Sequence, residues 1–208
     1  MINDDDLKRE VQKSIDKMYT ALHINHYKQL IAYNRFIIEN IIDTITGALL
    51  TILMNKYYYN ILGSMHKATI NMSNGRIEID NFGLLIGADD NRENIEEIIY
   101  VFSCKFYRKE LSIFSCDVKL QYDTNLEASI LYIESELLDD LDVTDYDNLK
   151  IKNSEEACSL MEKMVRHNDT LDTICFALED LLKIDEIKNI IDRLVFIIDG
   201  EEGDKNEE

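Results

Sequence analysis

The stretch "ATINMSNGRIEID" (Ala68–Asp80) decides the fold class, because apolar and polar residues alternate in it while the sequence before it follows helical spacing. Alternation on both sides of Ser73-Asn74-Gly75 is typical of strands that bury one face. Asn-Gly readily takes the positive φ angles of tight hairpin turns. The stretch therefore predicts a β-hairpin within a mainly helical chain, and an α+β fold.

The sequence before the hairpin predicts an N-terminal pair of long helices. Apolar spacing indicates one helix from about residue 5 to 22 and a second from Tyr27 into the mid-fifties, with His23–His26 between them. The most apolar run, "FIIENIIDTITGALLTILM" (Phe36–Met54), contains Glu39 and Asp43. These charges favour a buried amphipathic helix over a membrane span.

The sequence after the hairpin predicts a small antiparallel sheet followed by a C-terminal helical cluster. We expect a short helix over 89–102, two strands within 104–122 and a helix over 124–141. Capping residues and periodicity then indicate three more helices, at 154–167, 169–183 and 185–199. A short disordered acidic tail is expected from about residue 201.

Charge divides the chain into two parts. The net charge is −19, yet residues 1–65 hold seven acidic and seven basic side chains, so the whole excess lies in residues 66–208. We interpret 1–65 as a charge-neutral helical docking or dimerisation region and 66–208 as an acidic α+β body. A strongly anionic chain is poorly suited to binding nucleic acid directly.

The excess negative charge is densest in "YIESELLDDLDVTDYDNLK" (Tyr132–Lys150). Residues 120–149 contain nine acidic residues and no Lys or Arg. Such a surface steers basic partners and resembles the phosphates of a nucleic acid in charge. The predicted partner-binding residues are the seven carboxylates of this stretch: Glu134, Glu136, Asp139, Asp140, Asp142, Asp145 and Asp147.

An enzymatic alternative is a magnesium-dependent nuclease. Asp117-Val118-Lys119 has the acid-x-Lys spacing in which a carboxylate holds the metal and the lysine orients water. A second acid would come from Asp80, Asp89 or Asp90. This spacing is common by chance, and we expect the chain not to be an enzyme.

Other candidate sites are weaker still. Asp123–Glu134 partly fits a calcium-binding EF-hand loop, but Ala128 stands where that loop needs glycine. His23 and His26 have the spacing of paired metal ligands without further ligands nearby, and Cys158 with His167 lacks the surroundings of a catalytic pair. We expect no catalytic, metal or cofactor site.

The leading hypothesis is a non-enzymatic inhibitory or accessory protein, encoded by a phage or virus, whose acidic surface mimics nucleic acid toward a basic nucleic-acid-binding protein or nuclease complex. The alternative is an acidic dimeric chaperone or assembly adaptor that associates through its N-terminal helices. The start "MINDDDLKRE" is acidic where a secretion signal would be basic, and the four cysteines show no metal-binding spacing. We therefore expect a cytoplasmic protein with free thiols and no membrane partner.

Overall fold

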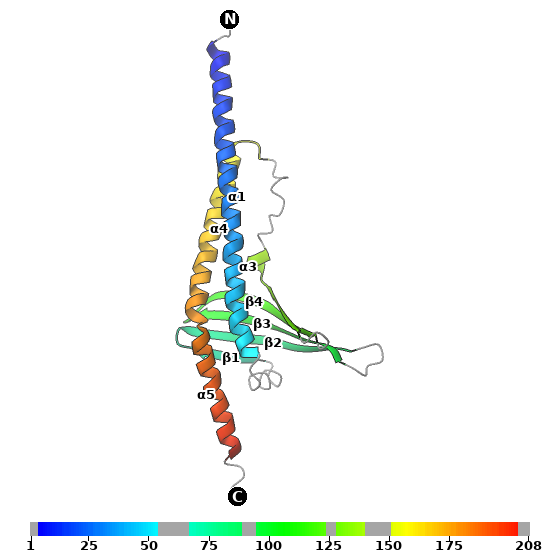
Figure 1. Ribbon diagram of the computed structural model, residues 1–208. Coiled ribbons are helices and arrows are strands. Elements are labelled where there is room, and N and C mark those ends of the chain that lie inside the picture. Colours follow the sequence, from blue (N-terminus) through cyan, green and yellow to red (C-terminus); the bar gives the residue numbers. More distant parts are fainter. Residues whose placement is uncertain (1–3, 54–66, 89–94, 124–127, 140–150, 204–208) are drawn as a thin grey trace. The chain divides into compact units, whose positions relative to one another are not determined.

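The computed structural model describes residues 4–53, 67–88, 95–123, 128–139 and 151–203. A long helix, α1 (Asp4–Leu53), precedes a five-stranded antiparallel sheet, and three helices follow it: α3 (Glu136–Asp139), α4 (Ser154–Leu181) and α5 (Ile184–Gly203) (Figure 1). The predicted α+β fold, with a long N-terminal helical part, a small antiparallel sheet and a C-terminal helical part, is confirmed.

The chain forms two compact units. The helical unit comprises Met1–Asn40 and Leu141–Thr173, and the sheet unit comprises Ile41–Asp140 and Ile174–Glu208. Their boundaries fall inside α1 and α4. Residue 65, where the charge pattern places a boundary, lies outside the described residues, so the regions 1–65 and 66–208 stay predictions.

Two parallel helices build the helical unit. The Ser154 hydroxyl donates to Asp16 at 2.9 Å, and the Asn168 amide donates to the Leu30 carbonyl at 2.7 Å. Both pairs are 138 residues apart in sequence, so α1 and α4 run in the same direction with a constant offset. A narrow buried cluster lies between them, formed by Tyr27, Ile31 and Met164 with Leu30 and Leu160 beside it.

The expected interruption of the N-terminal helix at His23–His26 is wrong, because α1 is one helix of 50 residues. No Gly or Pro precedes Gly47, and histidine is compatible with a helix interior. By length and composition alone α1 could cross a membrane, a property that core helices of soluble proteins share. Its second half buries one side, including Ile37, Ile41, Ile45, Leu49 and Ile52.

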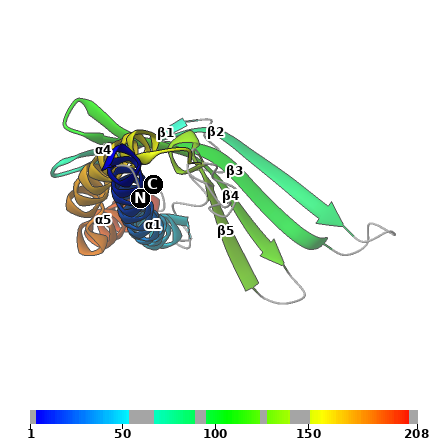
Figure 2. The same cartoon turned by 90° about the horizontal axis from the view of Figure 1, so that it is seen from above.

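Five strands follow one another in the sheet: β1 (Lys67–Met72), β2 (Gly75–Ala88), β3 (Ile95–Arg108), β4 (Leu111–Asp123) and β5 (Ala128–Glu134) (Figure 2). The predicted hairpin is confirmed, since Met72 pairs with Gly75 across a two-residue turn. Gly75 does not have a positive φ, however. A side chain there would collide with the Tyr107 carbonyl, and this close approach explains the glycine.

Two predicted helices are strands. The segment expected as a helix over 89–102 belongs from Ile95 onward to β3, and the one expected over 124–141 contains β5 and only the four-residue α3. β3 carries apolar residues on both faces near Ile98–Phe102, so its spacing fits a helix as well as a strand. Pairing with β2 and β4 decides the outcome.

The sheet buries one face. Ile77, Ile79, Cys104, Phe106 and Val118 are buried on it, and buried side chains of α1, α4 and α5 complete the core: Ile45, Leu49, Leu178, Leu181 and Ile187. The turns are bound to helices as well. The Ser73 hydroxyl donates to Glu186 at 2.9 Å, and Arg108 pairs with Asp180 at 2.9 Å.

The C-terminal helices are longer than expected. α4 is continuous where two helices were predicted, and α5 passes Gly200 and ends at Gly203. The expected start of a disordered tail at about residue 201 is therefore wrong for residues 201–203, and residues 204–208 lie outside the described part. All four cysteines are free thiols, as predicted.

Candidate functional site

The second face of the sheet is polar around its middle. The strand registers place one residue from each strand in a single row, because Lys67 is opposite Asp80, Asp80 opposite Ser103, Ser103 opposite Asp117, and Asp117 opposite Glu134. Side chains alternate between the two faces of a strand, so this row points away from the buried face. We call it the cross-sheet row.

The cross-sheet row lies in an open hollow of about 640 Å³. Serines and Asn81 line part of it, and its walls carry five acidic side chains against two basic ones: Glu78, Asp80, Asp117, Glu134 and Glu136 against Lys67 and Lys105. The hollow is therefore acidic.

At the β1–β2 side of the hollow, basic groups compensate the carboxylates. Arg76 pairs with Glu78 at 2.8 Å, and this hydrogen bond holds the pKa of Glu78 below its ordinary value. The Asn81 backbone N–H donates to Asp80 at 2.9 Å and Lys67 lies 3.3 Å away, so the pKa of Asp80 is also lowered. The charges of Glu78 and Asp80 are therefore balanced by partners within the sheet.

At the β4–β5 side, negative charges meet without a compensating cation. Asp117 accepts a hydrogen bond from the Ser103 hydroxyl at 2.7 Å and stands directly opposite Glu134. Among the described residues, neither of these carboxylates nor that of Glu136 forms an ion pair. Like charges directly opposite each other destabilise a sheet. We call Asp117, Glu134 and Glu136 the uncompensated acids.

A hydrogen bond between the end of β5 and β4 fixes the uncompensated acids in place. Ser135, between the two glutamates, is buried, and its hydroxyl donates to the Ser115 carbonyl at 2.9 Å. This bond ties the end of β5 to β4, so the exposed Glu134 and Glu136 are held beside Asp117. The site is built on strands, which position side chains better than free loops do.

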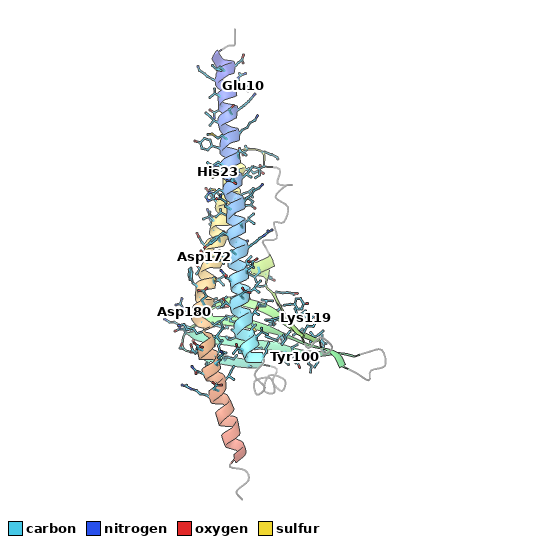
Figure 3. The ribbon with its side chains drawn as sticks, in the orientation of Figure 1. Glu10, His23, Tyr100, Lys119, Asp172 and Asp180 are labelled. Carbon is cyan, nitrogen blue, oxygen red and sulfur yellow. The ribbon has the colours of Figure 1, made fainter. Side chains whose placement is uncertain are left out.

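Lysines near the hollow are engaged elsewhere or stand apart. The Lys119 ammonium lies 5.5 Å from the centre of the Tyr132 ring, a cation–π contact on the polar face of the strands. Figure 3 labels Lys119 on the sheet. Lys105 is opposite Glu78, whose carboxylate instead bonds Arg76. Lys119 lines a second hollow together with Asp117 and Glu134. Among the described residues, however, neither lysine forms an ion pair with an uncompensated acid.

Two of the seven predicted partner-binding residues are placed in the hollow, Glu134 and Glu136. Asp139 is the last residue of α3, and its side chain is outside the described part. The remaining four, Asp140, Asp142, Asp145 and Asp147, also lie outside the described residues, so their role stays a prediction. The expected helical presentation of Glu134 is wrong, because it lies on β5.

Sequence reasoning did not assign Asp117 to the acidic surface. Asp117 entered only through the nuclease alternative, and its partner Glu134 is 17 residues away in sequence. Alternation of apolar Cys116 and Val118 around Asp117 did indicate an outward side chain. The strand register was the missing information.

The metal-dependent alternatives gain no support from the described residues. No group of three or more His, Cys, Asp or Glu side chains among them could hold a metal ion. Asp117 and Asp80 share a face but are separated by β3, and Asp89 and Asp90 lie outside the described part. β5 occupies the second half of the EF-hand register, which removes the loop geometry.

The two remaining candidate pairs, Cys158 with His167 and His23 with His26, form no site among the described residues. Cys158 and His167 lie on α4 nine residues apart, which corresponds to roughly 13 Å along a helix. His23 is half-buried and His26 exposed within α1.

Comparisons of the chain with protein-family models, curated proteins and solved structures gave no match.

Proposed function

We propose that the chain is a non-enzymatic binding protein whose acidic hollow receives a basic group of a partner protein. The observation that carries the proposal is the cross-strand pair of Asp117 and Glu134, with Glu136 in the same hollow; among the described residues, none of these three carboxylates forms an ion pair. A basic side chain bound there would remove the repulsion and complete the charge pattern of the hollow.

Electrostatics also favours a basic partner. The chain carries a net charge of −19, and a strong field of one sign accelerates association with a partner of the opposite sign. Neighbouring strands place Asp117 and Glu134 about 5 Å apart, and Asp80 lies two strands, or about 10 Å, from Asp117. This is a negative array of the kind that nucleic-acid-binding proteins recognise in phosphates. We infer that the partner is a nucleic-acid-binding protein or nuclease complex that this chain inhibits.

The test uses an octa-arginine peptide as a basic probe, titrated by calorimetry into the full chain. Glu134→Lys/Glu136→Lys should weaken binding at least tenfold. The matched control is Asp169→Lys/Asp192→Lys, which changes the net charge equally at two exposed acids of α4 and α5. Equal losses in both variants would show that only total charge matters and would overturn the proposal.

A second candidate, the chaperone or assembly adaptor, is favoured by a separate observation. Leu85, Ile130 and Tyr132 are exposed apolar side chains on the same face as the cross-sheet row. A client bound through them would be held by apolar contact. Its affinity should change little between 50 and 300 mM salt, roughly the range over which a charge-driven complex weakens steeply.

A further inference from the structure

α1 carries a second apolar face that α4 does not cover. Five large side chains of its first part are 37 to 61% exposed: Leu7, Val11, Ile15, Met18 and Leu22. We call them the N-terminal stripe. Figure 3 shows this part of α1 carrying its side chains around Glu10, ahead of His23.

The stripe and the α4 contacts lie on opposite sides of the helix. Asp16, Tyr27 and Ile31 contact or face α4. With 3.6 residues per turn, positions 11, 15, 18 and 22 are rotated by roughly half a turn from these residues. From Asp16 onward the helix therefore uses one side for α4 and leaves the other side apolar and exposed. Residues 6–15 precede the start of α4 and are all exposed.

We propose that the N-terminal stripe binds the same stripe of a second copy, giving a homodimer. The steps from Val11 to Ile15, Met18 and Leu22 are four, three and four residues, the spacing of a coiled-coil seam. Flanking positions Gln12 and Ser14 carry no charge that would repel an identical helix.

Charge favours a second copy over a charged partner. Residues 1–40 hold six acidic and six basic side chains, whereas the rest of the chain holds the whole excess of −19. Two copies can therefore meet at this segment without the repulsion that pairing of the acidic residues 66–208 would bring. A strongly basic partner would gain nothing here compared with the acidic hollow.

The exposed area of the stripe is that of a small dimer interface. Half-exposed side chains of these sizes present on the order of 500 Å² per chain, or about 1,000 Å² in a dimer, which is at the lower end for specific interfaces. We therefore expect a reversible dimer with a Kd in the micromolar range.

Sedimentation equilibrium of the full chain between about 1 and 200 μM tests this proposal, the range being set by the expected micromolar Kd. Wild type should shift from 24.3 kDa toward twice that mass. Met18→Glu/Leu22→Glu should weaken the dimer at least tenfold. Lys17→Gln/Lys28→Gln changes the net charge equally at exposed positions outside the stripe and should leave the Kd within about threefold.

Three results would overturn the proposal. The first is a wild-type monomer throughout the concentration range, which would mean that something other than a second copy covers the stripe. The second is an unchanged dimer in Met18→Glu/Leu22→Glu, and the third is equal weakening of the dimer in this variant and in the control. Far-UV circular dichroism checks that each variant is folded, and Val11→Glu/Ile15→Glu repeats the measurement at the other end of the stripe.

Discussion

Replacing Glu134 with lysine should stabilise the sheet unit even though it weakens binding of a basic probe. Opposite residues of an antiparallel pair have Cβ atoms about 5 Å apart, and two unit charges at that distance interact by about 0.8 kcal/mol in water. Glu134→Lys converts the repulsion by Asp117 into an attraction of similar size. The change from repulsion to attraction is about 1.6 kcal/mol by Coulomb's law, and exposed ion pairs contribute less than that value, so the expected gain in free energy of unfolding is about 1 kcal/mol at low salt.

Urea unfolding followed by far-UV circular dichroism measures this gain through the midpoint at unchanged slope. A double-mutant cycle isolates its origin, since Glu134→Lys should add almost nothing when Asp117 has already been changed to Asn. Asp169→Lys, an exposed acid of α4, controls for the lower net charge. The reasoning is refuted if Glu134→Lys destabilises the protein, or if its gain is the same with Asp117→Asn or at 500 mM salt, where the Debye length is roughly 4 Å.

Three further predictions concern the fold. Gly75→Ala should cost about 3 kcal/mol or more in unfolding free energy because the new Cβ meets the backbone of β3. Gly47→Ala should gain about 0.5 to 1 kcal/mol, because the new Cβ within helix α1 lies at an ordinary contact distance of 3.5 Å from the Ile184 side chain; urea midpoints measure both changes. Asn34→Leu should stabilise the protein by about 1 kcal/mol, because Asn34 is buried and its side-chain oxygen has no hydrogen-bond partner; a loss of that size would contradict this. Stability should fall as the pH drops below about 4, since Glu78 and Asp80 have lowered pKa values in the folded state and lose their partners on protonation; Glu78→Gln should flatten this part of an acid titration, and an unchanged profile would refute the assignment.

The local spacing of apolar residues was sufficient to predict those elements in which either the helical or the strand spacing clearly dominated. The hairpin over Ala68–Asp80 and the helical character of residues 154–199, though not the continuity of α4, were predicted because alternation or helical spacing was unambiguous there. The reason given for Gly75 was wrong, because the requirement comes from Tyr107 on β3 and not from its own φ. A contact across 32 positions of sequence is not visible in the local pattern.

The failures have the same physical origin. In β3 the apolar residues Ile95, Ile98, Ile99 and Phe102 match a helical face, and only pairing with two neighbours makes this segment a strand. For the site, composition correctly indicated negative charge near Glu134 and Glu136. It could not show that Asp117 stands opposite Glu134, since one-residue changes of register move a side chain to the other face.

The most direct test locates a bound basic probe on the chain. Isotope-labelled protein titrated with octa-arginine should show its largest amide chemical-shift changes at residues 115–119, in the middle of β4, and 132–136, at the end of β5, which carry the uncompensated acids. Saturation there before other residues respond would support the acidic hollow as the binding site. Changes spread evenly over acidic residues of α4 and α5, with none concentrated at Asp117 and Glu134, would contradict it.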